Sequence, residues 1–178
     1  MKQVVISLAR RKDRRREFLR TAGSQGFEFS WFTAIDGKVD YPQESKAGAR
    51  GCLESHKEVL RQALVNPEKE DLLICEDDAV IQCTPENVDF AVSNHPDTDV
   101  LFLFEPKNWC VGTWAYFVPH TSIEKVLRAI EEAQELGFRH LDQIYLHIRR
   151  QQLAKISWTK WTWFNHAPRD AAESDIEW

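Results

Sequence analysis

The sequence predicts a single α/β domain over residues 1–178, built as three layers with a largely parallel sheet between helices. Short apolar runs at 4–8, 72–75 and 99–105, the first of them rich in β-branched residues, have the length and composition of buried strands. Segments with helical spacing of apolar residues lie between these runs, and such alternation is typical of parallel sheets. A chain of 178 residues can also form one core that buries about 70% of its unfolded surface.

Composition limits the classes of function. The formal charge of −5 and the pI near 5.7 argue against a nucleic-acid partner bound through a broad basic face. The four cysteines show neither a Cys-x-x-Cys pair nor zinc-type histidine spacing, so we expect no disulfide framework and no structural zinc, as in a reducing cytosol. No apolar run approaches the roughly 20 residues of a transmembrane segment. We therefore expect a cytoplasmic protein, with peripheral contact at the inner membrane left open.

The first expected strand, residues 4–8, is followed at once by a basic turn. Residues 10–16 contain six cations and one anion, and a helix is expected from Asp13 to Gly23 or Gly26. Ligands of open α/β sheets bind beyond the carboxyl ends of strands, so these arginines are placed to meet phosphate or carboxylate groups. For most of them the alternative is a solvated helix face without specific contacts.

The next elements lead to a histidine with two interpretations. Residues 27–32 alternate apolar and polar, which predicts a half-buried strand, and 34–37 form its turn. Residues 38–50 are polar and lack periodicity, which indicates a loop able to order over a ligand. A helix is expected from Gly51, with His56 on its apolar stripe. His56 is then either a buried core residue or a ligand-binding one.

The apolar run at 72–75 ends in three adjacent carboxylates, Glu76, Asp77 and Asp78. Such charges persist most easily where a divalent cation or a ring of donors compensates them, and carboxylate oxygens suit Mg²⁺ or Mn²⁺. In an extended backbone Glu76 and Asp78 share one side and can supply the metal, whereas Asp77 points away and can hold a ribose or order the loop. The alternative is a solvated acidic cluster at a strand end.

The second half of the sequence continues the alternation. Thr84 followed by Pro85 indicates a helix start, and Thr121 with Glu124 has the pattern of a capping box. The tail at about 156–178 concentrates tryptophans and acids. The expected elements are a short helix from Thr84, strands at 99–105 and 112–118, a helix from Thr121 to Gly137, and a last helix around 141–148.

Five short motifs occur in a defined order between about residues 4 and 146. They are Val4-x-Ile6-Ser7-Leu8 with Arg11 and Arg14, Phe32-x-Ala34-x-Asp36-Gly37, Gly51-Cys52-x-x-Ser55-His56, Ile74-x-Glu76-Asp77-Asp78-Ala79, and Gly112-Thr113-x-x-Tyr116. In this order they resemble the motifs of glycosyltransferase family 25, which includes lipooligosaccharide and collagen galactosyltransferases.

The resemblance implies a nucleotide-sugar-binding fold of the GT-A type with a DxD-like acidic motif for Mn²⁺ or Mg²⁺. It also implies inverting transfer of a sugar, galactose or similar, from a UDP-sugar donor to a hydroxyl group of a glycan or glycolipid acceptor in surface lipooligosaccharide synthesis. Metal ligands on this interpretation are Glu76, Asp78 and His166, although His166 can instead pack among tryptophans. The expected donor-binding residues are Ser7, Leu8, Arg11, Arg14, Asp36, Ser55, His56, Asp77, Thr113 and Tyr116.

An inverting transfer needs a base for the acceptor hydroxyl, and a carboxylate is the usual choice. Asp142 is the candidate by its position after the 112–118 strand and the following helix, and a helix-capping role is the equal alternative. Trp109 or Trp114 can form a wall for a sugar ring, or fill the core. Two other functions stay open: a non-catalytic nucleotide-sugar or partner-binding relative, and a metal-dependent phosphoryl-transfer or hydrolytic enzyme.

Overall fold

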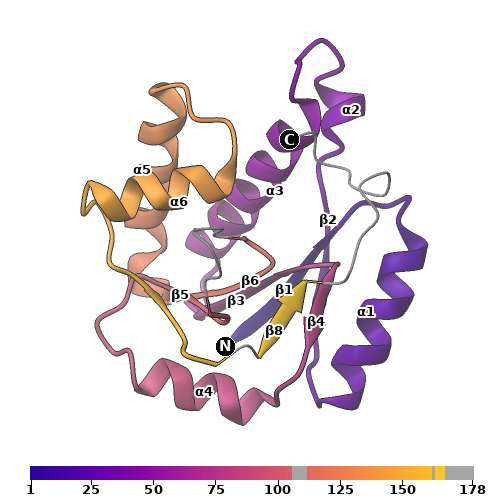
Figure 1. Ribbon diagram of the computed structural model, residues 1–178, viewed down its shortest axis with the longest axis vertical. Helices are drawn as coiled ribbons and strands as arrows, with labels where there is room; N and C mark the ends of the chain where they lie inside the picture. The colour runs from indigo at the N-terminus through magenta and orange to yellow at the C-terminus, as the bar shows by residue number, and fades with distance from the viewer. Residues whose placement is uncertain (106–111, 162, 167–178) are drawn as a thin grey trace.

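The computed structural model describes residues 1–105, 112–161 and 163–166 and confirms the three-layer α/β class (Figure 1). The strands are β1 (Lys2–Ser7), β2 (Ser30–Thr33), β3 (Leu72–Glu76), β4 (Ala79–Ile81), β5 (Val100–Phe102), β6 (Ala115–Val118), β7 (Ile156–Trp158) and β8 (Phe164–His166). The helices are α1 (Lys12–Ser24), α2 (Gly37–Asp40), α3 (Ala47–Leu64), α4 (Pro85–Ser93), a 3₁₀ turn (His120–Ser122), α5 (Ile123–Glu135) and α6 (Leu141–Arg150).

The central sheet has the strand order β2-β1-β3-β6-β5-β7. β1 pairs in parallel with β2 and β3, and β5 pairs in parallel with β7. β6 lies antiparallel to both of its neighbours, β3 and β5, so it alone of the six runs against the others. The prediction of a largely parallel sheet is confirmed. The carboxyl ends of β1, β2 and β3 therefore lie side by side at one edge of the sheet.

Alternation along the strands builds a core on each face of the sheet. Val4 and Ile6 of β1 face one core, which includes the buried side chains of α3, α5 and α6. Val5 faces the other, which includes those of α1, α4, β4 and β8. Figure 1 shows the same division of the helices, with the two-stranded β4-β8 ribbon on the side of α1 and α4. Period-two side-chain alternation thus produces the three layers.

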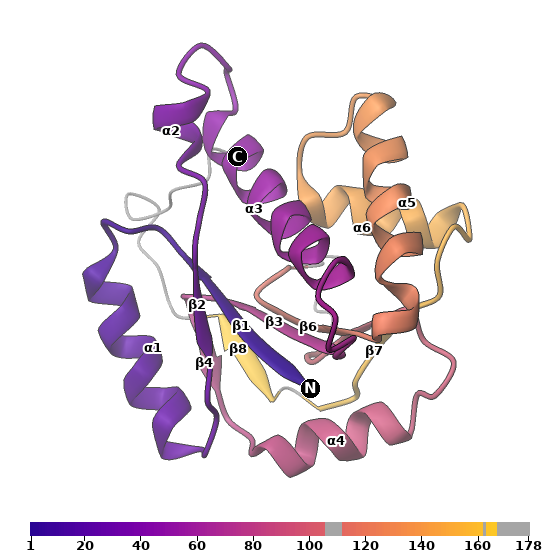
Figure 2. The ribbon, with the colours of Figure 1, turned by 180° about the vertical axis from the view of Figure 1, so that it is seen from behind.

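The expected loop at 38–50 is wrong for much of its length. Asp36 caps α2 by accepting a hydrogen bond from the backbone N–H of Lys38, and α3 begins at Ala47. The backbones of the two helices touch, since a Cβ placed on Gly37 would lie 1.7 Å from the carbonyl oxygen of Ala47. Figure 2 shows α2 beside the amino end of α3. This contact is between distant segments and leaves no periodic signal in the sequence.

Two boundaries in the second half also differ from expectation. The helix start at Thr84 is confirmed, with a capping box to Asn87. At α5, however, the predicted capping box is wrong: the N-cap is Ser122, which makes no side-chain cap hydrogen bond. The Ser122 hydroxyl instead donates to Asp99 at 2.7 Å. Tertiary contacts therefore replace the local cap.

The tail contributes strands that its composition did not predict. β7 extends the central sheet beside β5, and β8 pairs with β4, in register Ala79 with His166. Within the described ranges, no helix combines the length and apolar character needed to cross a membrane.

Candidate functional site

A pocket lies at the edge where β1 and β3 end, opposite the loop after β2 and the first half of α3. The space between its lining residues amounts to about 580 Å³, including the part open to solvent. The structure brings most of the predicted donor-binding residues together here. Those that line the pocket are Ser7, Leu8, Arg14, Asp36, Ser55, His56 and Asp77, together with Glu76 of the predicted metal ligands.

Asp77 is held at the base of the pocket by two contacts from the first motif. Ser7 Oγ donates to Asp77 Oδ2 at 2.8 Å, and Arg14 Nη1 donates to Asp77 Oδ1 at 3.3 Å. Arg15, which the sequence did not single out, donates to Ser7 Oγ at 3.0 Å and fixes that hydroxyl. Burial raises the pKa of Asp77, and the hydrogen bond from Ser7 and the charge of Arg14 only partly oppose this effect. The pocket thus contains a carboxylate whose desolvation is incompletely compensated.

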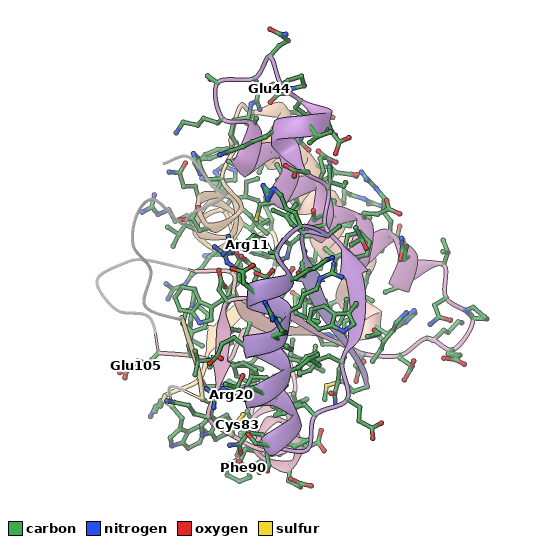
Figure 3. All side chains as sticks on the ribbon, turned by 90° about the vertical axis from the view of Figure 1, so that its right-hand side faces the viewer. Arg11, Arg20, Glu44, Cys83, Phe90 and Glu105 are labelled. Carbon is green, nitrogen blue, oxygen red and sulfur yellow. The ribbon has the colours of Figure 1, made fainter. Side chains whose placement is uncertain are left out.

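Two neighbouring arginines of the basic turn behave differently. Arg10 lines the pocket and pairs with Asp36, with Nε 3.2 Å from Oδ2. Arg11, at the amino end of α1 in Figure 3, pairs with Asp13 at 2.8 Å and is not among the lining residues. The structure therefore places Arg10, rather than the predicted Arg11, beside Arg14.

His56 combines both of its interpretations, because it is fully buried and also lines the pocket. Its Nδ1 lies 2.7 Å from the Tyr116 hydroxyl, and its Nε2 lies 3.4 Å from Glu76 Oε1. Thr113 Oγ1 donates to the same Glu76 oxygen. Thr113 and Tyr116 thus support site residues from behind and are not themselves among the lining residues.

Ser55 positions the backbone around the pocket. Its hydroxyl accepts a hydrogen bond from the Ile35 N–H at 2.9 Å and donates to the Gly51 carbonyl at 2.6 Å. A Cβ on Gly51 would lie 2.5 Å from the backbone nitrogen of Gly37. Gly37 and Gly51, from the second and third motifs, therefore allow the loop after β2 to pack directly against α3.

The acidic residues do not keep the alternation expected of an extended chain. β3 ends at Glu76, and 77–78 form a turn in which the Asp77 N–H donates to the Ile6 carbonyl. Both Asp77 and Asp78 approach Arg14, with Asp78 Oδ2 at 3.6 Å, whereas Glu76 turns to His56. The expected opposite orientation of Asp77 and Asp78 is wrong because the backbone turns between them.

The donor atoms of this acidic turn, defined as residues 76–78, fit Mg²⁺ or Mn²⁺ in type, since all are carboxylate oxygens. Arg14 compensates two of the three charges in this structure. His166, the third predicted ligand, belongs to β8, whose pairing sets its backbone opposite Ala79, next to the turn. The His166 side chain lies outside the described part of the chain.

Cys52 was missed as a site residue. It lies one helical turn before His56 on α3, and the ligand atoms of Cys52, His56 and Glu76 all lie within 4.8 Å of one another. The i, i+4 spacing of a cysteine and a histidine on one predicted helix was the available signal.

Asp142 lies in the first turn of α6, half-buried, and is not among the residues that line the pocket. Its Oδ1 accepts a hydrogen bond from the Gln143 N–H, while the N-cap position belongs to His140. His140 Nε2 lies 2.8 Å from Lys46 Nζ, at the amino end of α3. Burial and the charge of Lys46 lower the pKa of His140, so a neutral imidazole accepts from the ammonium.

The proposed sugar-wall tryptophans give no wall in the described structure. Trp109 falls outside the described residues. Trp114 stacks on Phe104 at 4.2 Å and its indole N–H donates to the Phe164 carbonyl. It packs against both core clusters.

Comparison with known proteins identifies sequence and structural relatives. The family model described as "Glycosyltransferase family 25 (LPS biosynthesis protein)" matches residues 1–132. No curated protein matches the sequence. A solved glycosyltransferase involved in the glycosylation of the major capsid of PBCV-1 is similar, with a TM-score of 0.57, 16% identity, and 98% of each chain covered.

Two further glycosyltransferases share the fold. The galactosyltransferase LgtC, solved with donor and acceptor sugar analogues, has a TM-score of 0.54 and 8% identity over 89% of this chain and 73% of its own. GlyE of Streptococcus pneumoniae TIGR4 has a TM-score of 0.52 and 10% identity over 90% of this chain and 45% of its own. The predicted GT-A-like fold is confirmed by these likenesses.

Proposed function

The chain belongs to glycosyltransferase family 25, and on that basis we propose that it transfers a sugar, galactose or a similar hexose, from a UDP-sugar to a hydroxyl group of a glycan or glycolipid. The observation that supports this proposal most is the pocket at the carboxyl ends of β1 and β3. Four of the five motifs contribute residues to its lining, although these residues are spread over about 70 positions of the sequence.

The charges of the pocket suit the two parts of a nucleoside diphosphate. Arg10 and Arg14 are cations at the wall, and guanidinium groups bind phosphate oxygens through charge-assisted hydrogen bonds. Asp36 and Asp77 are acceptors for ribose hydroxyl or base N–H groups. A diphosphate would compete with Asp36 and Asp77 for the arginines, so donor binding would rearrange the existing ion pairs.

The acidic turn would hold Mn²⁺ or Mg²⁺ through Glu76 and Asp78, with His166 as a further ligand. When bound, such an ion supplies Lewis-acid stabilisation of the leaving diphosphate. The chain's own contribution would be the positive charge of Arg14. Its guanidinium lies 3.3 Å from Asp77 and 3.6 Å from Asp78, and it can pair either with these carboxylates or with the leaving phosphate.

For the acceptor step we propose inversion, with Asp142 as the base. Lys46 and His140 connect the amino end of α6 to that of α3, and Gly48, just after Lys46, lines the pocket. Asp142→Asn should keep UDP affinity and thermal stability while transfer falls roughly 10²-fold or more. Near-normal transfer by the variant would assign the base to another carboxylate. The anomeric configuration of the product, read by NMR, would test inversion.

The acceptor belongs, on this proposal, to surface lipooligosaccharide synthesis at the cytoplasmic side of the inner membrane, which the protein would contact peripherally. The test is release of UDP from a panel of UDP-sugars, with and without Mn²⁺ and candidate glycan acceptors. Acceptor-dependent release supports transfer, and release without any acceptor would favour a hydrolase. Metal-dependent UDP affinity should fall in Asp78→Asn, and equal affinity at saturating Mn²⁺ would contradict the metal assignment.

A further inference from the structure

Three side chains of different chemistry converge on one wall of the pocket. Cys52 and His56 occupy successive turns of α3, and Glu76 ends β3 beside them. Each offers one ligand atom, and these atoms lie within 4.8 Å of one another. The cysteine spacing in the sequence predicts no structural zinc, and the predicted metal ligands include only Glu76 from this set.

His56 is oriented as a metal-binding histidine is. Its Nε2 is buried and makes no hydrogen bond, although Glu76 Oε1 lies 3.4 Å away, while its Nδ1 is engaged by the Tyr116 hydroxyl at 2.7 Å. Metal-bound histidines generally engage the second ring nitrogen with a polar partner. The Tyr116 hydroxyl can accept a hydrogen bond from an Nδ1–H, and in that tautomer the Nε2 lone pair is available to a metal. A buried ring nitrogen that makes no hydrogen bond costs free energy unless a ligand binds it.

The distance between His56 and Glu76 agrees with a small tetrahedral ion. His56 Nε2 and Glu76 Oε1 are 3.4 Å apart. Two nitrogen or oxygen ligands at usual zinc distances are separated by about 3.3 Å in a tetrahedron. Thr113 donates a hydrogen bond to the same carboxylate and holds it in place. Both ligands of this pair are therefore supported by an outer partner, as in established metal sites.

We propose that Cys52, His56 and Glu76 bind a Zn²⁺-type ion, with a fourth coordination position facing the pocket. Thiolate, imidazole and carboxylate together select zinc or cobalt over Mg²⁺, which prefers oxygen alone. Cys52 and Glu76 are each partly exposed and line the pocket, so the ion has an entry route. A water or a phosphate oxygen would take the open position.

This ion differs from the hard cation proposed at the acidic turn. Asp77 and Asp78 face Arg14, and only Glu76 could belong to both sites. The two assignments therefore predict different mutational patterns. The zinc-type site also stands without the proposed sugar transfer, because its evidence is the arrangement of ligand atoms alone.

The test is a titration of the full chain with Co²⁺ in the absence of nucleotide. Binding is monitored by the absorption spectrum of the Co²⁺ complex. Thiolate-to-cobalt charge transfer is expected in the near ultraviolet. Cys52→Ala should remove this band and weaken Co²⁺ binding by more than the roughly 10–100-fold that losing an outer partner costs. Cys83→Ala is the matched control, because Cys83 is buried in the core with α1 and α4 and does not line the pocket. Figure 3 shows Cys83 at the level of the carboxyl end of α1.

A second readout is independent of the variants. Zn²⁺ should protect Cys52 of the unmodified chain from alkylation, as located by mass spectrometry, and excess Mg²⁺ should not. The proposal is overturned if Co²⁺ and Zn²⁺ do not bind, if the Co²⁺ complex lacks the thiolate band, or if binding is lost in Asp78→Asn and kept in Cys52→Ala. None of these results depends on whether a sugar is transferred.

Discussion

The protein has two groups of buried polar side chains, one between α3 and α5 and one in the pocket at the sheet edge. One faces α5: Lys57 Nζ donates to Gln134 at 2.6 Å and to Glu54 at 3.2 Å, and Gln134 also donates to Glu54. The other is the pocket group at the sheet edge, where Asp77 contacts Ser7 and Arg14. Both contain a carboxylate that folding removes from water.

The two carboxylates have opposite pKa shifts. Burial alone would raise the pKa of Glu54, but the Gln134 hydrogen bond and the charge of Lys57 outweigh it and lower the pKa. Burial also raises the pKa of Asp77, and there Ser7 and Arg14 do not outweigh it. The helix interface thus compensates its buried charge internally, whereas the partners of Asp77 in the pocket do not fully offset the effect of its burial. Incomplete compensation beside a cavity is typical of functional sites.

The largest expected effect is on the pocket side, through its backbone contacts. Gly51→Ala would put a Cβ 2.5 Å from the Gly37 nitrogen and 2.6 Å from the Ile35 carbonyl oxygen. Backbone atoms cannot rotate away, so we expect a loss of about 3 kcal/mol or more in the free energy of unfolding, measured in urea. Gly23→Ala, with open space around its Cβ position, is the control and should change stability by at most about 1 kcal/mol. Equal effects would show that the α2–α3 contact is dispensable.

The next effect belongs to the helix interface. Lys57→Met removes the ammonium that Glu54 and Gln134 share, while Arg50 remains 3.3 Å from Glu54. We expect the free energy of unfolding to fall by about 2 kcal/mol, as for a lost charged hydrogen bond, with UDP affinity unchanged. A clear loss of UDP affinity in the folded variant would break the distinction between the two groups.

A smaller effect, on binding, is expected from Arg14→Ala. Loss of one charge-assisted contact to phosphate should weaken UDP affinity about 10-fold or more by calorimetry. Arg20→Ala is the control on the same helix, because Arg20 pairs with Glu17 near the other end of α1 (Figure 3). If both variants weaken binding equally and salt removes the effect, the arginines act only as a diffuse positive field.

The smallest effect separates the two carboxylates by the sign of a pH dependence. The Glu54 pKa is lowered below 4.5, so its stabilisation is present at neutral pH and is lost as the pH falls through its folded pKa. The Asp77 pKa is raised above 3.8, so the folded state holds that proton more tightly and the contribution of Asp77 to stability decreases as the pH rises. From pH 3 to 7, Glu54→Gln should become progressively more destabilising, and Asp77→Asn progressively less so. Urea unfolding across this range tests the prediction, and slopes of the same sign would refute it.

The sequence was most informative where apolar periodicity determines structure. The strand at 72–75 and the helix from Thr84 follow from patterns within one segment. The backbone contact of Gly37 with α3 and the pairing of β8 with β4 join distant segments, so local pattern could not reveal them.

The site residues were likewise predictable from patterns within one segment and not from contacts between distant segments. Ser7, Arg14 and Asp77 were predicted from motifs, and all three line the pocket. Arg10 was passed over for Arg11 because the orientation of neighbouring residues in a turn depends on backbone geometry that composition does not encode. Cys52 was missed because its partner Glu76 comes from another element.

The central claim is that the incompletely compensated group at the sheet edge binds the nucleotide and the compensated one does not. Hydrogen–deuterium exchange with and without UDP and Mn²⁺ tests this claim directly. We predict slower exchange in 6–10, 34–37, 48–56 and 74–78, with no change in α5, which faces the other group. Protection confined to other segments, or equal protection of α5 and the pocket segments, would contradict the claim.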